Sequence, residues 1–148
     1  MVWKPHVTVA AVLERDGLFL LVEENTPDGV LFNQPAGHLD PGESVSSAAI
    51  RETLEESAYH FVPDALVGIY QWHQTTHNRT YLRFAFTGKI TGYEPDRRLD
   101  EGIIRAVWQT PEEILGNRHS HRSPLVWDCV ADYIKGERYP LALLRYYV

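Results

Sequence analysis

Residues Gly37 to Tyr59 read GHLDPGESVSSAAIRETLEESAY, and the rest of the chain is organised around them. The stretch opens with a loop that contains a proline and glycines, which favour a turn over regular structure. A helix is predicted to follow, beginning near Ser44 or Val45, because the charged and apolar residues after this point recur at helical spacing. The sequence therefore predicts a loop that leads directly into an amphipathic helix.

The predicted helix has an acidic face. At about 100° of rotation per residue, Glu52, Glu55 and Glu56 fall within one arc of roughly 100°. Ile50 and Leu54 are expected on the opposite side. Carboxylates at this spacing repel one another by a few tenths of a kcal/mol per pair.

Something is expected to compensate this repulsion. Arg51 can pair with Glu55, but one cation does not balance several acids. A hard divalent cation such as Mg²⁺ would, because it is held by carboxylate, carbonyl and water oxygens. A solvated acidic helix face is the alternative, since charge clusters are common on protein surfaces.

The spacing of the charged residues decides between these readings. Six positions match the pattern G-x5-E-x7-R-E-x2-E-E, namely Gly37, Glu43, Arg51, Glu52, Glu55 and Glu56. This arrangement resembles the Nudix box, in which bulky aliphatic residues and a closing glycine complete the motif. The chain departs from it with Thr53 and Tyr59 at aliphatic positions and Ala58 at the glycine position. None of these departures removes a carboxylate.

Length and composition describe an ordinary globular protein. The chain has 148 residues, 44% of them hydrophobic and 23% charged, which suits one domain over residues 1–148. The net charge of −6 argues against a nucleic-acid polymer as partner. Cys129 is the single cysteine, so neither a disulfide framework nor a thiolate zinc site is expected. No run of apolar residues in the sequence approaches the length that a membrane span needs, and a cytoplasmic location is expected.

Strand signals dominate outside the acidic helix. Strands are predicted at residues 6–13, 18–23, 30–33, 65–74, 79–90 and 103–109, with turns or loops at 15–17, 25–29 and 75–78 and a break at Pro63 and Asp64. A short helix is predicted at 112–115 and a longer one at 123–135. The tail 139–148 is a candidate for a last short strand. This order predicts an α+β fold with helices layered on a sheet. The resemblance implies the same arrangement, an α/β/α sandwich with a mixed central sheet and the box as loop, helix and loop.

The resemblance extends beyond the box. Segments such as KPHVTVA, NQPAGHL, LRF, EEIL and RSPLV look like a bacterial phosphatase branch of the Nudix family, the NudJ branch. That likeness implies Mg²⁺-dependent hydrolysis of nucleoside di- and triphosphates and of thiamine-type diphosphates, including the hydroxymethylpyrimidine diphosphate precursor, with release of phosphate. Mn²⁺ is a possible substitute for Mg²⁺.

The resemblance also implies roles for the box residues. Glu55 and Glu56 look like the main metal ligands, together with the backbone carbonyl of Gly37. Glu52 resembles either a third ligand or the group that positions and deprotonates the attacking water. Arg51 looks like the residue that holds these carboxylates in place by bidentate pairing.

Two further acids have open roles. Glu43 can orient Arg51 or the helix start, or it can simply suit the positive end of the helix. Glu101 ends a loop just before a strand, where some Nudix enzymes supply an extra ligand or base. A loop acid in water is the alternative for Glu101.

Contacts to the rest of the substrate are less constrained. Arg83 is expected on the polar face of its strand and Arg122 just before a helix N-terminus, both as phosphate contacts. His38 lies inside the box loop and can reach a phosphate. Trp72 and Tyr81 can stack on a ring, although aromatic residues in strands more often belong to the core.

Other substrate classes and functions stay open at this point. ADP-ribose and dinucleoside polyphosphates are alternative substrates, because the box handles only the diphosphate. A non-catalytic Nudix ligand sensor is a further alternative, but such versions generally lack box glutamates. The partner is expected to be a small-molecule phosphate anhydride, and the protein a monomer or small homo-oligomer that binds no membrane.

Overall fold

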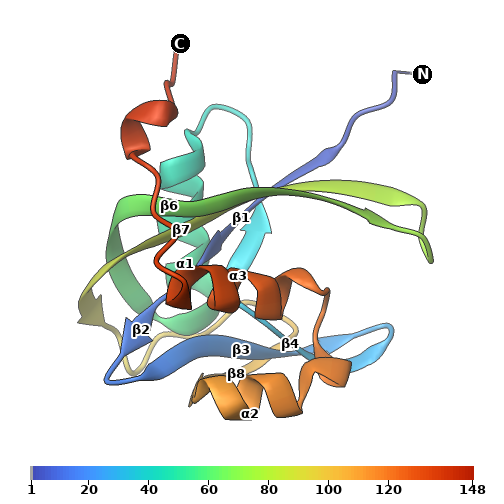
Figure 1. Ribbon diagram of the computed structural model, residues 1–148, viewed down its shortest axis with the longest axis vertical. Helices are drawn as coiled ribbons and strands as arrows, with labels where there is room; N and C mark the ends of the chain where they lie inside the picture. The colour runs from blue at the N-terminus through green and yellow to red at the C-terminus, as the bar shows by residue number, and fades with distance from the viewer. Residues whose placement is uncertain (1) are drawn as a thin grey trace.

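The computed structural model describes residues 2–148, and within them the strands form two sheets with four strands each (Figure 1). The first sheet, called the mixed sheet below, has the order β5 (Ala36–His38), β1 (His6–Ala11), β7 (Arg79–Tyr93) and β6 (Tyr59–Gln74). Its strands β1 and β7 are parallel, and its other neighbours are antiparallel. The antiparallel sheet consists of β2 (Glu14–Arg15), β3 (Leu18–Thr26), β4 (Gly29–Asn33) and β8 (Ile103–Gln109).

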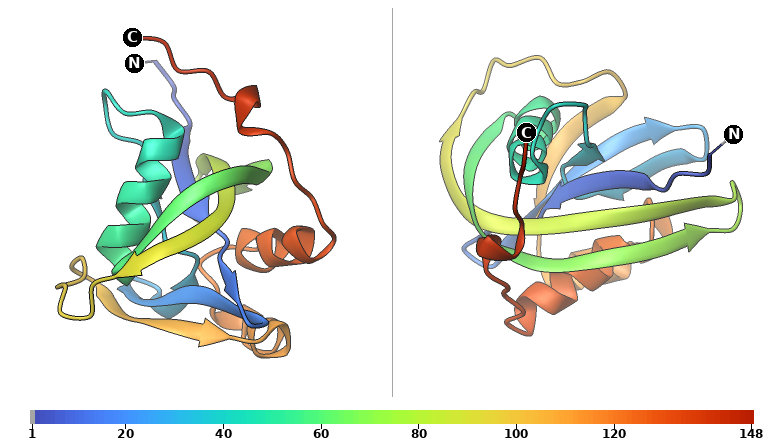
Figure 2. Two further views of the ribbon diagram at one scale, coloured as in Figure 1. Left: turned by 90° about the vertical axis from the view of Figure 1, so that its left-hand side faces the viewer. Right: turned by 90° about the horizontal axis from the view of Figure 1, so that it is seen from above.

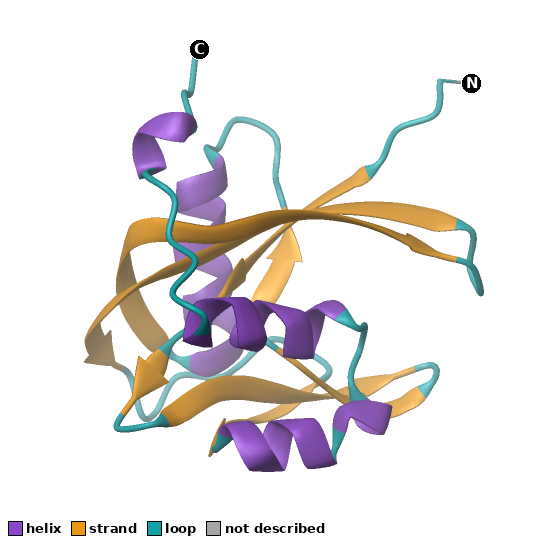
Figure 3. Ribbon diagram, in the orientation of Figure 1, coloured by secondary structure: helices purple, strands orange, loops and turns teal. Residues whose placement is uncertain are grey.

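Helices cover both faces of the mixed sheet (Figures 1 and 3). On one face, α1 (Val45–Ser57) packs against a buried cluster that contains residues such as Val9 and Phe86. On the other face, α3 (Leu125–Ile134) packs through a second cluster that contains Val12 and Ala85. The views in Figure 2 show α1 and α3 separated by the sheet. The predicted α+β sandwich with a mixed sheet is therefore confirmed, and the remaining strands form the separate antiparallel sheet.

The helix α1 begins where the sequence predicts it. Ser44 is the N-cap, and its hydroxyl accepts a hydrogen bond from the Ser47 N–H at 3.1 Å. At the other end, Ala58 adopts the left-handed conformation with φ of 66°, and its N–H donates to the Leu54 carbonyl. The helix therefore ends in a left-handed turn even though alanine replaces the glycine of the motif.

The buried face of α1 differs from the prediction. It consists of small residues, Ala48, Ala49, Thr53 and Ser57, whereas Ile50 is exposed. Small side chains let the helix axis approach β1 and β5 closely, and bulky ones would hold it away. The prediction of a buried apolar face at Ile50 was wrong, because close packing of the helix requires small side chains on its buried face rather than large hydrophobic ones.

The predicted chain break at Pro63 and Asp64 was also wrong. The strand β6 runs through both residues, with Pro63 opposite Gly88 of β7 and an irregular register before Ala65. Proline has no N–H to donate, and it is tolerated here because β6 is an edge strand with a bulge. Sequence alone does not reveal which strand will be at an edge.

Several shorter elements fall close to their predicted positions. The helix α2 (Pro111–Gly116) starts with a complete capping box between Thr110 and Glu113. The predicted loop 25–29 is shorter than expected, since β3 continues to Thr26 and β4 starts at Gly29. The tail does not form a strand: it has a 3₁₀ turn, η2 (Leu141–Leu143), and one isolated bridge between Leu66 and Tyr139.

Across residues 2–148, none of the helices has the length and apolarity that a membrane span needs.

Candidate functional site

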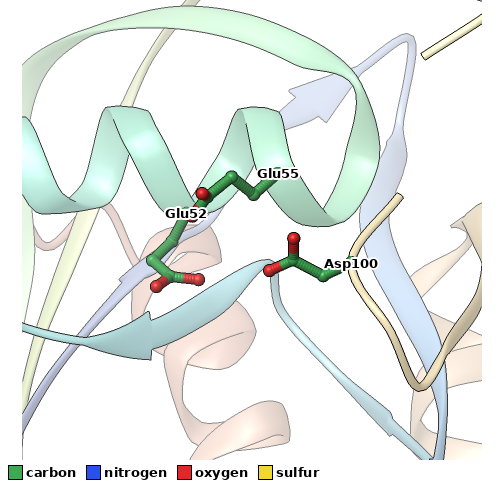
Figure 4. A group of neighbouring side chains, drawn as sticks. All are labelled: Glu52, Glu55 and Asp100. Atoms are coloured by element: carbon green, nitrogen blue, oxygen red, sulfur yellow. The ribbon is translucent and has the colours of Figure 1, made fainter. Parts of the chain in front are cut away.

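The acidic face of α1 meets the loop between β7 and β8. Carboxylate oxygens of Glu52, Glu55 and Asp100 lie within 4.8 Å of one another. Figure 4 shows the two glutamates on the same helix and Asp100 facing them from the loop before β8. The Asp100 N–H donates to the Glu55 carbonyl at 3.0 Å, which fixes this loop against the helix. We call these three residues the acidic cluster.

Asp100 was not among the predicted site residues. The acidic end of the loop 92–102 was the available signal, and it led to the prediction of the neighbouring Glu101. In the structure Glu101 is exposed and lies outside the acidic cluster. Loop conformation decides which of two adjacent acids faces the helix, and spacing in the sequence does not contain that information.

Arg51 connects the box residues. Its Nη1 donates to Glu52 at 2.7 Å and to Glu55 at 2.8 Å. Its Nε and Nη2 form a bidentate pair with Glu43 at 3.0 and 2.6 Å, and Nη2 also donates to the His38 carbonyl. The geometry is the bidentate pairing that was expected for Arg51, with Glu43 as the bidentate partner.

These contacts change the protonation behaviour of the pair. Hydrogen bonds from Arg51 hold the pKa of the Glu43 carboxyl below its usual value. The pKa of the Arg51 guanidinium is raised, first by Glu43 and then by Glu52 and Glu55. Arg51 therefore stays charged and orients the carboxylates around it.

Glu56 occupies a different environment from the other acids. Its Oε1 accepts a hydrogen bond from the Ala36 N–H at 3.0 Å, at the edge strand β5. Burial raises the pKa of its carboxyl to about 9, and the charges of Glu24, Glu52 and Asp100 act in the same direction. Glu56 is outside the acidic cluster and lies on the wall of the adjoining pocket instead.

Glu52 connects the acidic cluster to this pocket. Burial raises the pKa of its carboxyl, while Arg51 opposes the shift. The backbone of Gly37 runs directly past it: a Cβ on this glycine would lie 2.1 Å from the Glu52 Cδ. The first glycine of the box is therefore required by the close approach of this carboxylate.

The pocket beside the carboxylates has a volume of about 400 Å³. Most predicted contact residues line it, including Gly37, His38, Glu52, Glu56, Trp72, Tyr81, Arg83 and Arg122. Trp72 and Tyr81 stack on each other with their ring centroids 5.7 Å apart. Burial lowers the pKa of the His38 imidazole, which therefore favours its neutral form. Tertiary structure thus brings together residues that are far apart in sequence.

Arg83 is not on a solvated strand face as predicted. Arg83 is only 6% exposed, and its guanidinium donates to the side-chain oxygens of Gln34 at 2.9 Å and of Asn33 at 2.8 Å. Packing of α3 and of the end of β4 over this face of β7 buries it, although it still lines the pocket. Arg122 pairs with Glu24 at 3.1 Å on the same wall.

The donor set of the acidic cluster fits a hard divalent cation. Its ligand atoms are all carboxylate oxygens, which suit Mg²⁺ or Mn²⁺ and do not resemble the thiolate and imidazole sets of zinc. Arg51 supplies one positive charge to several acids at once, so negative charge remains in excess around Glu52 and Glu55. The cluster can therefore hold a metal that a phosphate substrate also contacts.

Comparison with known proteins agrees with this site. The model of the NUDIX domain family matches residues 4–128. A curated relative, the phosphatase NudJ of Escherichia coli K12, is 39% identical over 142 residues, which cover 96% of this chain and 92% of the relative. The resemblance to the NudJ branch is thereby confirmed at the level of sequence.

Solved structures show the same fold. A NUDIX hydrolase from Nitrosomonas europaea is 52% identical, with a TM-score of 0.94 over 97% of this chain and 98% of that one. The NUDIX domain of Shewanella oneidensis NrtR, solved with ADP ribose, is 17% identical and has a TM-score of 0.73 over 91% of this chain and 90% of that domain, so it shares the fold alone. The family model, the relative and the first structure each span most of the chain, and the chain therefore belongs to the Nudix family, as a hydrolase acting on phosphorus-containing anhydrides.

Proposed function

We propose that this hydrolase cleaves the diphosphate linkage of nucleoside di- and triphosphates and of thiamine-type diphosphates, including the hydroxymethylpyrimidine diphosphate precursor, and releases orthophosphate. The observation that supports it is the acidic cluster beside a pocket that Glu52 lines together with the arginines Arg79, Arg83 and Arg122. The named activity of the E. coli relative, a phosphatase, supports the same reaction class. A cytoplasmic location suits these substrates and stays a prediction.

Mg²⁺, or Mn²⁺ in its place, is the proposed cofactor. Glu52, Glu55 and Asp100 would hold it, and Glu56 and the Gly37 carbonyl are proposed as further ligands from residues that line the adjoining pocket. When bound, the ion supplies charge neutralisation at the phosphate oxygens and lowers the pKa of a coordinated water.

The protein residues position the reacting groups. Water adds to one phosphorus, the bridging P–O bond breaks, and the bridging oxygen keeps the electron pair. We assign the proton of the water to the Glu52 carboxylate, which lines the pocket beside the acidic cluster and accepts a hydrogen bond from Arg51. Arg51 holds Glu52 and Glu55 at fixed positions through Nη1.

The test is orthophosphate release from thiamine diphosphate, nucleoside di- and triphosphates, and ADP-ribose. Each is assayed with Mg²⁺ and with EDTA, on wild type, on Glu55→Gln, and on Glu112→Gln as a control on the exposed surface of α2. Orthophosphate from the first two groups, lost with EDTA and in Glu55→Gln but kept in the control, is the expected result.

Two other results would refute the proposal in different ways. Turnover of ADP-ribose alone, seen as AMP and ribose phosphate, would keep the metal site and reject the substrate class. Binding without turnover of any compound would indicate a ligand sensor.

A further inference from the structure

Arg83 is a buried cation without an acidic partner. Its guanidinium donates to the amide oxygens of Asn33 and Gln34, and its third neighbour is the Cys129 sulfur at 3.9 Å. All three partners are neutral. No carboxylate of residues 2–148 lies within 4.0 Å of it.

A buried charge of this kind is unfavourable by itself. Amide oxygens satisfy the hydrogen bonds of a guanidinium, but they do not neutralise its charge, and a lone buried ion is destabilising by several kcal/mol. Buried arginines are normally paired for this reason. The fold retains this one at the wall of the pocket, where a ligand can supply the missing negative charge.

The acids of the pocket do not neutralise Arg83 directly. Three arginines, Arg79, Arg83 and Arg122, line the pocket together with four acids, Glu24, Asp40, Glu52 and Glu56. Glu24 is paired with Arg122 at 3.1 Å, and no ion pair joins it to Arg83. Among the described residues, the guanidinium of Arg83 therefore has no carboxylate partner of its own.

The strand register aligns Arg83 with the box loop. Thr8 of β1 is aligned with Arg83 on one side and with His38 of β5 on the other, so the row leads from the arginine to the box loop. Two residues along, toward the turn of the β6–β7 hairpin, the pair Trp72 and Tyr81 follows on the same face of the sheet. Glu52 and Glu56 line the same pocket.

Arg83 lies between the pocket and the core. Its partners Gln34 and Cys129 are fully buried and do not line the pocket, and the Gln34 amide donates to the Val126 carbonyl of α3 at 2.7 Å. A group that contacts the guanidinium from the pocket therefore has packed side chains on the far side of Arg83. This arrangement suits an unsubstituted phosphoryl group and excludes one that is substituted on its far side.

We propose that Arg83, with Arg122 beside it, is a metal-independent anion site that holds the terminal phosphoryl group of the substrate and selects against diphosphates substituted at both ends. Its role in selection rests on the proposed function, whereas its affinity for a phosphate does not. The ring of the substrate would then lie toward Trp72 and Tyr81.

The first experiment measures binding of inorganic phosphate without metal. Isothermal titration in EDTA compares wild type, Arg83→Lys, Arg122→Gln, and Arg105→Gln as the control, an exposed arginine that pairs with Glu23 outside the pocket. Because lysine cannot make the bidentate contact, we expect phosphate affinity to fall about 10-fold or more in Arg83→Lys. The control is expected to match wild type.

The result is decisive even if one variant is unstable. Circular dichroism identifies a variant that does not fold, and Arg122, which is half-exposed, then tests the same site without disturbing the buried network. Absence of phosphate binding by the metal-free wild type would overturn the proposal. Wild-type affinity in both folded pocket variants would overturn it as well.

The second experiment measures selection with Mg²⁺ present. A nucleoside diphosphate is compared with its ester that carries one methyl group on the terminal phosphate. We expect kcat/KM to be about 10-fold lower or more for the ester in wild type, and this ratio to narrow in Arg83→Lys mainly through KM. Equal kcat/KM for the two compounds would reject the selective role.

The two proposals fail separately. Phosphate binding that depends on Arg83, with no turnover of either compound, would reject the proposed hydrolysis and support the anion site. Turnover of the diphosphate without metal-independent binding of phosphate would support the proposed hydrolysis and reject the anion site.

Discussion

Replacing Gly37 with alanine should separate catalysis from folding. The added Cβ would lie 2.1 Å from the Glu52 Cδ and 2.3 and 2.4 Å from its two carboxylate oxygens. Ordinary contact begins at 3.4 Å, so the carboxylate must withdraw by about 1.3 Å. The backbone carbonyl of residue 37 is retained, and the perturbation therefore acts on Glu52 alone.

The cost to stability should be small, because the displaced atoms are the end of a flexible side chain. Alanine in a strand is also favoured over glycine by about 0.5–1 kcal/mol, which offsets part of any strain. The catalytic cost should be large, since a 1 Å misplacement of a reacting group lowers the rate by about 10²-fold. We expect kcat to fall by that factor while the melting temperature changes by a few degrees at most.

The assay measures kcat and KM at saturating Mg²⁺, with thermal unfolding followed by circular dichroism. Gly116→Ala is the matched control, since nothing lies within 4 Å of a Cβ at that position. A Gly37→Ala variant with wild-type kcat would refute the reasoning, because Glu52 would then tolerate a displacement larger than a catalytic group allows. Loss of folding would refute it too.

Three further predictions follow from the same structure. Burial raises the pKa of the Glu56 carboxyl to about 9 in the metal-free fold, against 4.5 in the unfolded chain, so the folded state binds more protons between these values and loses stability as the pH rises. In EDTA, Glu56→Gln should therefore have a higher melting temperature than wild type at pH 8 and about the same melting temperature at pH 5. An equal difference in melting temperature at both pH values would contradict this. Asp100→Asn should raise the Mg²⁺ concentration for half-maximal activity by about 10-fold or more, whereas Glu101→Gln should change it less. The reverse order would show that Glu101, and not Asp100, completes the metal site. Gly88→Ala would bring a Cβ within 2.0 Å of the Val62 carbonyl oxygen. Because backbone atoms cannot move aside, the free energy of unfolding, measured in urea, should fall by about 3 kcal/mol. An unchanged free energy of unfolding would refute the β6–β7 register.

The helix α1 and its box were predictable because they depend on local spacing. Helical rotation places Glu52 and Glu55 on one side whatever the rest of the chain does. The cap at Ser44 and the capping box at Thr110 are also decided by residues within one turn. Local spacing is therefore enough to place Glu52 and Glu55 beside Arg51, as the hydrogen bonds of the structure show.

The environments of the acids were not predictable in the same way. Glu55 and Glu56 are neighbours in sequence, yet Glu55 joins the acidic cluster, while Glu56 is buried against β5. Which one is desolvated depends on the position of β5, which was not predicted as a separate strand. Their protonation behaviour follows from that burial rather than from residue type.

The family, the α+β class, the helix that presents the carboxylates and the pairing of Arg51 with them could be predicted, since all of these depend on residue order over short distances. The fold was needed to show that Asp100 completes the acidic cluster and that Pro63 lies within an edge strand. It was also needed to show that the Arg83 guanidinium is buried with no acidic partner among residues 2–148. These depend on which segments pack together over long separations, and burial there sets the free energy of each charge. The chemistry of these residues therefore depends on the neighbours that the fold places around them, and not on residue type alone.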